Sequence, residues 1–400
     1  MSKRLLASLA LVLALILAAD VLSLGLSRGL VGFAPNLAAQ LRPFSTEPVD
    51  AIARQRLAAG DAASAHALAT ASLSREPMDA NTLGILGLAQ AAGSQPQAAL
   101  RTMRLAGALS WRDEATQTWL LRNSITTGQV DDAVLRADSL LRRTRDSGSS
   151  PVSAMLIAAA ELVPQFQSAL AARLALSPNW RARFLIQLGQ APGAAAAARS
   201  VLGDLRTGPT PPTAQEAAAL VASEVQRHQF AQARLDWLAL APHRGGLPNA
   251  AITDGQFAGV SDGTDFTWVL ESGVGATLDR VAATDLGRGQ QALSVLYDGY
   301  STTDMASQLL TLPPGPHTLT WRERIDEGDG RFLAWTIACG AGGATLAQVT
   351  GQAPQLGVWR TRQLSFTVPA TGCEGQWLRL VGVPGDQRGT NSALYTDFAV

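Results

Sequence analysis

The chain has 400 residues, and its 32 lysine and arginine residues balance 32 aspartate and glutamate residues. Zero net charge argues against a nucleic-acid binder that works through bulk positive charge, and 47% hydrophobic residues exclude a mostly disordered chain. Only 16% of the residues are charged, which excludes a long charged coiled coil. The length suits two or three domains with cores of their own.

The neutral total hides an uneven distribution of charge. Residues 51–248 carry 19 basic and 14 acidic residues, whereas residues 249–400 carry nine basic and 15 acidic residues. The composition also changes near residue 248, from rich in Ala, Leu and Arg to rich in Gly, Thr and Trp. These two changes together predict a domain boundary at that point.

The amino terminus begins with an apolar run over residues 5–26 that only Asp20 interrupts. A cleaved signal peptide has small residues before the cleavage site, but Leu17 stands where one of them is expected before a cut at Asp20. An uncleaved signal anchor needs about 20 apolar residues to cross a bilayer, and residues 5–26 supply them if Asp20 lies near the interface. We favour the anchor, a transmembrane helix within residues 1–30.

Both alternatives export the rest of the chain. Lys3 and Arg4 precede the apolar run, so the positive-inside rule predicts a single-pass protein of a bacterial inner membrane, with a cytoplasmic amino terminus and a periplasmic bulk. The two cysteines of the chain, Cys339 and Cys373, both lie in the carboxy-terminal part. In an exported domain they predict one disulfide; two buried free thiols are the alternative.

The middle of the chain has apolar residues at helical spacing and contains an internal repeat. Three glycines lie 33 and 35 residues apart, and an alanine follows each by five positions: Gly60 and Ala65, Gly93 and Ala98, Gly128 and Ala133, with a fainter copy at His228 and Ala233. This spacing predicts a turn between two antiparallel helices that cross closely at a small residue. The pattern resembles the tetratricopeptide repeat, whose period is about 34 residues.

The resemblance implies an α-solenoid over residues 50–244, with a concave surface that binds proteins of the cell envelope. A plain helical bundle is the alternative, because residues 151–215 are rich in proline and carry the repeat only weakly.

Residues 249–400 show short β-strand patterns separated by Gly, Pro and Asp clusters. The expected strands are residues 292–297, 318–325, 332–339, 364–368, 377–381 and 394–400. Short strands at regular spacing over about 150 residues predict an antiparallel β-sandwich or jelly roll.

Three segments of this domain resemble the jelly-roll carbohydrate-binding modules of galactose-binding-like fold. They are Ile252–Phe257 followed by Trp268, the Pro-Gly turn within Leu312–Leu319, and the final strand Leu394–Val400. The resemblance implies a carbohydrate-binding sandwich and polysaccharide as a partner.

The same resemblance implies a structural calcium ion, held in that family by a glutamate of the opening strand and an aspartate of the last strand. Asp397 matches the aspartate, but Ala258 stands where the glutamate is expected. A calcium ion requires six or more oxygen ligands. This chain would supply one carboxylate fewer than the members of that family do.

Side-chain alternation along the expected strands identifies candidate sugar-binding residues. Alternation places Trp359, Trp377 and Arg379 on the outside of the sandwich, together with Arg322 and Arg324. Flat aromatic faces pack against sugar C–H groups, and planar guanidinium groups bind sugar hydroxyls. The alternative is that these aromatics cover a sheet face shared with the helical domain.

The combination predicts a non-enzymatic, membrane-anchored periplasmic scaffold in cell-envelope or exopolysaccharide assembly or export, without a nucleic-acid partner. A purely protein-binding assembly factor is the second hypothesis. A glycan-active enzyme is the third, because glycoside hydrolysis uses two carboxylates. Four acids occur together, Glu323, Asp326, Glu327 and Asp329, but this cluster is more typical of a solvated turn.

Overall fold

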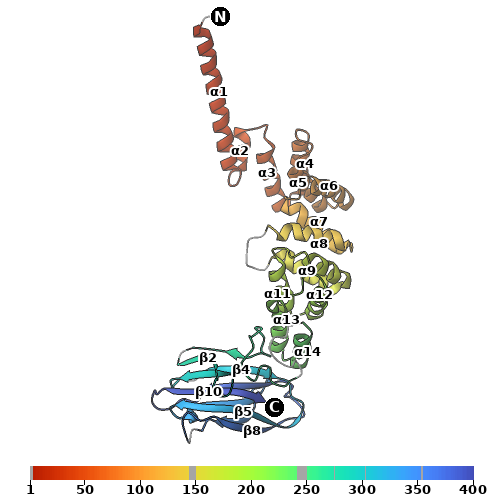
Figure 1. Cartoon of the computed structure of the whole chain (residues 1–400). Helices are drawn as coiled ribbons and strands as arrows, with labels where there is room; N and C mark the ends of the chain where they lie inside the picture. The colour runs from red at the N-terminus through yellow and green to blue at the C-terminus, as the bar shows by residue number, and fades with distance from the viewer. Residues whose placement is uncertain (1–2, 144–149, 241–249, 274, 302, 353–354) are drawn as a thin grey trace. The chain divides into compact units, whose positions relative to one another are not determined.

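The computed structural model of the chain describes residues 3–143, 150–240, 250–273, 275–301, 303–352 and 355–400. The chain divides into two compact units, Met1–Leu156 and Ile157–Val400. Helices α1 to α14 come first along the chain and strands β1 to β10 follow (Figure 1). The predicted order of a helical part and then a β-domain is confirmed, whereas the predicted boundary at residue 248 lies outside the described residues.

The first helix, α1 (Lys3–Leu30), contains the apolar run of the amino terminus. Its segment Val12–Leu30 is long and apolar enough to cross a membrane, and a signal sequence would have the same properties. The amino-terminal apolar helix is therefore confirmed. Its orientation and the identity of the membrane stay predictions.

Acidic side chains mark the start of three later helices in the first unit. The carboxylates of Asp61, Asp79 and Asp113 accept hydrogen bonds from backbone N–H groups of the first helical turn, which satisfies donors that the helix itself leaves unpaired. The helices after α1 are α2 (Pro35–Leu41), α3 (Thr46–Ala58), α4 (Ala62–Leu73), α5 (Ala80–Ala92), α6 (Pro96–Leu109), α7 (Glu114–Thr126) and α8 (Val130–Leu141). Each of α2 to α8 contacts its neighbour in sequence.

In the first unit, three of the helix pairs are joined by turns with one residue in the left-handed region. These residues are Gly60 (φ 80°), Ser94 (φ 61°) and Gly128 (φ 69°), each 34 residues from the next. A residue in this conformation after the last helical residue is a common way for a helix to end. The alanine five positions later is fully buried in every case: Ala65, Ala99 and Ala133. The predicted helix–turn–helix pattern is confirmed at these turns, and membership of the tetratricopeptide family stays a prediction.

The prediction for the second turn was wrong by one residue. Gly93 has an ordinary φ of −83°, and Ala98 is only partly buried. The turn instead uses Ser94, and Ala99 takes the crossing position. The predicted spacing counted five positions from Gly93 and therefore selected Ala98 as the crossing residue.

We expect Ser94→Gly to raise the free energy of unfolding by about 1 kcal/mol, because a side chain costs energy in the left-handed region. Thermal unfolding followed by circular dichroism measures the change. Ser94→Ala is the matched control: it retains a Cβ at the same position and should bring no gain. A glycine variant no more stable than the alanine variant would contradict the assignment of the turn.

The second unit begins within α9 (Pro151–Leu162) and continues with five helices. They are α10 (Pro164–Leu174), α11 (Arg181–Gln190), α12 (Ala195–Thr207), α13 (Ala214–Gln226) and α14 (Phe230–Leu240). Arg181 joins α11 to α13 through a buried ion pair with Glu216, 3.0 Å from Nε to Oε1. Glu216 also completes a capping box with Thr213 at the start of α13.

The strands form two five-stranded antiparallel sheets. Sheet A has the order β1-β4-β9-β6-β7 and sheet B the order β2-β3-β10-β5-β8. The strands are β1 (Val269–Leu270), β2 (Ala276–Ala282), β3 (Gln291–Tyr297), β4 (Asp304–Leu310), β5 (Gly315–Glu327), β6 (Leu333–Cys339), β7 (Thr345–Thr350), β8 (Arg360–Val368), β9 (Gln376–Gly382) and β10 (Asn391–Ala399), with a short 3₁₀ helix at Gly330–Phe332. All six expected strands are present, and the predicted β-sandwich is confirmed.

Large aromatic side chains fill the space between the two sheets. Phe398 lies at the centre of this group, with its ring centroid 4.7 Å from that of Trp335 and 5.4 Å from that of Trp268. Cys339 and Cys373 form a buried disulfide that joins the end of β6 to the segment before β9. The predicted disulfide is confirmed.

The last two helices pack against the sandwich within the second unit. Phe230 and Trp237 of α14 belong to one buried cluster with Phe266 and with Leu309 of β4, and Trp377 packs against this cluster. The indole N–H of Trp237 also donates a hydrogen bond to Asp262, 2.6 Å away. The outer side of sheet A is therefore partly covered by helices.

Candidate functional site

The outer side of sheet B brings together three of the five predicted sugar-binding residues. Trp359 directly precedes β8, which pairs with β5, the strand that carries Arg322 and Arg324. The guanidinium carbon of Arg324 lies 5.3 Å from the centroid of the indole ring of Trp359, and that of Arg322 lies 5.8 Å away. Together with Asp285, these residues are called the Trp359 platform below.

Asp285 holds the Trp359 platform in place. Its Oδ2 accepts a hydrogen bond from the indole N–H of Trp359 at 2.7 Å and another from Arg324 Nη1 at 2.5 Å. Desolvation opposes ionisation of Asp285, but the hydrogen bond from Trp359 and the charge of Arg324 outweigh it and lower the pKa of the carboxyl group. Arg324 also forms a two-point ion pair with Asp326, at 2.7 and 2.9 Å. The indole and the guanidinium of Arg324 therefore have defined orientations.

The Trp359 platform combines an apolar base with a polar border. Trp359 packs against a small buried cluster of Ala283, Ala292 and Leu394 on the outer side of sheet B. Next along β8, Thr361 and Gln363 are exposed. A partly buried indole beside planar guanidinium, amide and hydroxyl groups is suited to contact a sugar ring and its hydroxyls.

The structure separates the other two candidates from this platform. Trp377 and Arg379 lie on β9 of sheet A. Trp377 packs against the cluster formed with α13 and α14, and its ring contacts the guanidinium of Arg379, 5.1 Å from the centroid. Alternation placed both residues on the outside of the sandwich, but sheet A directs them to the helix-covered side.

The surroundings of Asp397 do not fit a calcium ion. Its Oδ1 accepts a hydrogen bond from the side-chain amide of Gln256 at 3.0 Å, and its Oδ2 lies 3.8 Å from Arg322 Nη1. A guanidinium already supplies a positive charge next to the carboxylate, where a calcium site needs further oxygen ligands. Among the described residues, no group of three or more His, Cys, Asp or Glu side chains is arranged to hold a metal ion.

Glu323 is a buried acid that sequence reasoning assigned to a solvated turn. It is 1% exposed and points between the sheets, opposite Tyr395 in the pairing of β5 with β10. Burial raises the pKa of its carboxyl group, and the charge of Arg362, 3.4 Å away, opposes the rise. Alternation from Leu319, Trp321 and Ile325 could have identified this orientation, because Glu323 has the same parity.

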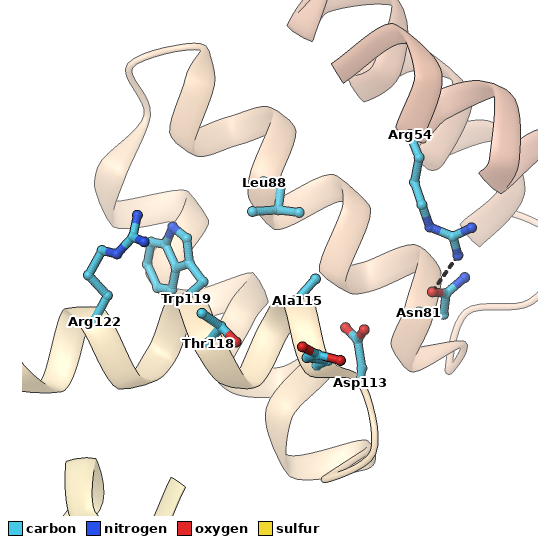
Figure 2. Close-up of a pocket in the computed structure, with 9 residues that line it drawn as sticks. Arg54, Asn81, Leu88, Asp113, Ala115, Thr118, Trp119 and Arg122 are labelled. Carbon is cyan, nitrogen blue, oxygen red and sulfur yellow. Dashed lines mark hydrogen bonds between the residues drawn. The ribbon is translucent and has the colours of Figure 1, made fainter. Parts of the chain in front are cut away.

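The first unit contains a pocket of about 600 Å³ between helices α3, α5 and α7. Figure 2 shows Trp119 and Arg122 side by side at one end and Arg54 at the other, where it donates a hydrogen bond to Asn81 at 2.6 Å. Leu88 lies between these ends. The remaining lining residues are Asp113, Glu114, Ala115 and Thr118. The pocket thus has an apolar middle and charged ends.

No protein-family model and no curated protein matches this sequence. Among solved structures, similar chains include a CBM61 module in complex with β-1,4-galactotriose (15% identity, 39% of this chain and 97% of that chain, TM-score 0.27). Others are a structure described as CBM4 (14%, 34% and 86%, 0.27) and a CBM22-1 xylan-binding domain from Paenibacillus barcinonensis (15%, 33% and 82%, 0.25). Identities and TM-scores this low do not establish a fold. The β-sandwich is established by the strand order of the chain itself.

Proposed function

We propose that this chain is a non-enzymatic, membrane-anchored binding protein of the bacterial cell envelope whose sandwich binds carbohydrate at the Trp359 platform. The observation that carries the proposal is the partly buried indole of Trp359, held by Asp285 and bordered by Arg322 and Arg324. A role in exopolysaccharide assembly or export would use one end of the chain to hold glycan and the rest to hold protein partners.

Charge on the Trp359 platform favours a neutral glycan. Arg324 is paired with Asp285 and Asp326, and Arg322 lies near Asp397. Two guanidinium groups thus face three carboxylates, so little positive charge is left to attract a uronate or phosphate. Arg322 is separated by 3.8 Å from its carboxylate partner, which leaves its N–H groups available to donate to sugar hydroxyls.

The separate contacts of three of the four acids around β5 support a binding role rather than hydrolysis. Glu323 points between the sheets and pairs with Arg362, whereas Asp326 pairs with Arg324 on the outer side. Asp329 accepts a hydrogen bond from the backbone N–H of Arg331. Glycoside hydrolysis requires two carboxyl groups on either side of one bond, and these acids have separate structural partners.

Trp359→Ala is expected to weaken glycan binding at least about tenfold, because a rigid aromatic commonly dominates such contacts. Binding of the purified full-length protein in detergent to a glycan array with neutral and acidic fragments measures the change. Trp377→Ala is the matched control: it removes an indole from the helix-covered side and should leave glycan binding intact. A wild-type protein that binds no glycan, or two variants with equal losses, would contradict the proposal.

A protein-binding role of the helical part is the second candidate function. The pocket between α3, α5 and α7 supports it, because Trp119 and Leu88 provide apolar contacts and the charged side chain of Arg122 lies beside Trp119 at one end of the pocket. The 34-residue spacing of left-handed turns is in keeping with a tetratricopeptide-like solenoid. Co-purification from detergent-solubilised membranes with the wild type, but not with Leu88→Arg, would support this role.

A further inference from the structure

The apolar amino-terminal helix α1 packs against a second, shorter helix. The short helix α2 lies beside the carboxy-terminal part of α1 (Figure 1), where the Ser27 hydroxyl donates a hydrogen bond to the Ala38 carbonyl at 3.2 Å. At the end of α2, Arg42 reaches back to α1. Its Nη2 lies 2.9 Å from Asp20 Oδ1, so the one charge that interrupts the apolar run has a partner from outside it.

The position of this ion pair divides α1 into two parts of different character. From Leu5 to Ala19 the helix has 15 uncharged residues, a length of about 23 Å at about 1.5 Å per residue, and snorkelling of the flanking Lys3 and Arg4 side chains accommodates a span somewhat shorter than the hydrocarbon core. From Asp20 onwards the helix contacts α2, and Arg28 lies 3.8 Å from Glu47. Placing this second part in hydrocarbon would bury four charged groups, which is costly even in pairs.

Large apolar side chains are exposed at the level of the ion pair. Phe44, three residues after the end of α2, is 84% exposed and Leu41 is 40% exposed. Both line a pocket of about 430 Å³ together with Asp20, Leu24 and Arg42. An exposed phenylalanine beside a charged pair, next to a helix that can span a bilayer, is suited to a boundary between headgroups and acyl chains.

We propose that the non-cytoplasmic surface of the membrane lies at the Asp20–Arg42 pair and that Leu41 and Phe44 dock into phospholipid at this level. This inference rests on the proposed membrane anchor and shifts the end of the span from Leu26 to Ala19. The partner is a lipid surface without a requirement for anionic headgroups, because Asp20 cancels the charge of Arg42. The segment from Asp20 to Phe44 then forms a collar that fixes the first unit at the membrane.

Spin-label accessibility in the full chain tests this placement. Both native cysteines are in the disulfide, so single variants Phe44→Cys, Ile16→Cys and Phe33→Cys can be labelled selectively without reductant. In phosphatidylcholine nanodiscs we expect the label at 16 to be accessible to oxygen and shielded from a water-soluble nickel complex. The label at 44 should lie within a few ångströms of the phosphates. Phe33, 76% exposed in the turn between α1 and α2, should carry a label in water.

Each alternative outcome has a distinct meaning. Labels at 44 and 33 that are both in water, with 16 in lipid, would overturn the collar and leave the anchor intact. Labels at 33 and 44 that are both in lipid would move the boundary to Leu30 and overturn the proposal. A label at 44 shielded from both reagents would indicate contact with a second protein chain instead of lipid. A label at 16 in water, or loss of residues 1–19 by mass, would refute the anchor itself.

Discussion

Phe230→Ala is expected to lower the free energy of unfolding of the second unit by about 3–5 kcal/mol, the usual cost of removing a buried phenylalanine. Phe230 is 2% exposed and is the first residue of α14. Its ring lies directly on the backbone of Gly340 and Gly375 in the sandwich. Urea-induced unfolding of the full chain, followed by tryptophan fluorescence, measures the loss, because Trp237 and Trp377 belong to the same contact.

The two glycines beneath Phe230 allow a sharper test. A Cβ at Gly375 would lie 2.5 Å from the ring of Phe230, so Gly375→Ala should cost about 1–3 kcal/mol through overpacking. In the Phe230→Ala background the same change should cost little, because the ring that it displaces is gone. Gly389→Ala, with nothing within 4 Å of the new Cβ, is the neutral control. Additive losses in the double variant would contradict the contact.

The disulfide lies next to this contact and explains why the surface beneath Phe230 is flat. Cys339 directly precedes Gly340, and Cys373 lies two residues before Gly375. The backbone N–H of Gly340 donates a hydrogen bond to the Gly375 carbonyl at 2.7 Å. The covalent bond and this hydrogen bond hold two chain segments side by side, and the absence of side chains at the glycines lets the ring approach them.

Strand alternation predicted the orientation of side chains well. Leu319, Trp321 and Ile325 face the core as expected, and Arg322 and Arg324 lie outside. Glu323 was missed because acids near glycines are usually solvated, although its parity pointed inward. Alternation states only which side of a strand a residue occupies. It contains no information on what covers that side.

The separation of Trp359 from Trp377 depends on strand pairing that the local pattern does not contain. Their strands β8 and β9 are consecutive in sequence, yet they belong to different sheets. Each sheet interleaves distant strands, so the outer side of one strand and the outer side of the next lie on opposite surfaces of the sandwich. The helices of the second unit then cover part of one surface only. A prediction from the sequence therefore grouped residues that long-range pairing separates.

The helical repeat shows the opposite case. There the local spacing of turn glycine and crossing alanine located each turn to within one residue. A residue with left-handed conformation ends the first helix of each pair, and a fully buried alanine follows at a fixed distance. Glycine is the usual residue for this role, and Gly60 and Gly128 have it. The second turn departs from this rule because its glycine, Gly93, lies one position too early. Ser94 therefore adopts the left-handed conformation, which costs energy for a residue with a side chain.

The stability of the second unit is expected to fall as the pH rises from about 4.5 to about 8, with Glu224 as a main cause. Glu224 of α13 is fully buried. Desolvation, together with the neighbouring Asp236 carboxyl group, raises its pKa from 4.5 to about 8, although the charge of Arg199 opposes the rise. Over that interval the folded state holds a proton that the unfolded state has released. Each pH unit should therefore cost up to about 1.4 kcal/mol.

Glu224→Gln separates this group from the other titrating residues, because the amide resembles the protonated acid and cannot ionise. Near pH 4.5 the variant and the wild type should have similar stability, whereas at pH 8 the variant should be more stable. Asp204→Asn, at an exposed position on α12, is the control and should leave the slope unchanged. Equal slopes for wild type and Glu224→Gln would contradict the assignment. The effect should extend to the helix–sandwich contact, because Val221 and Val225 on the same helix belong to the cluster around Phe230.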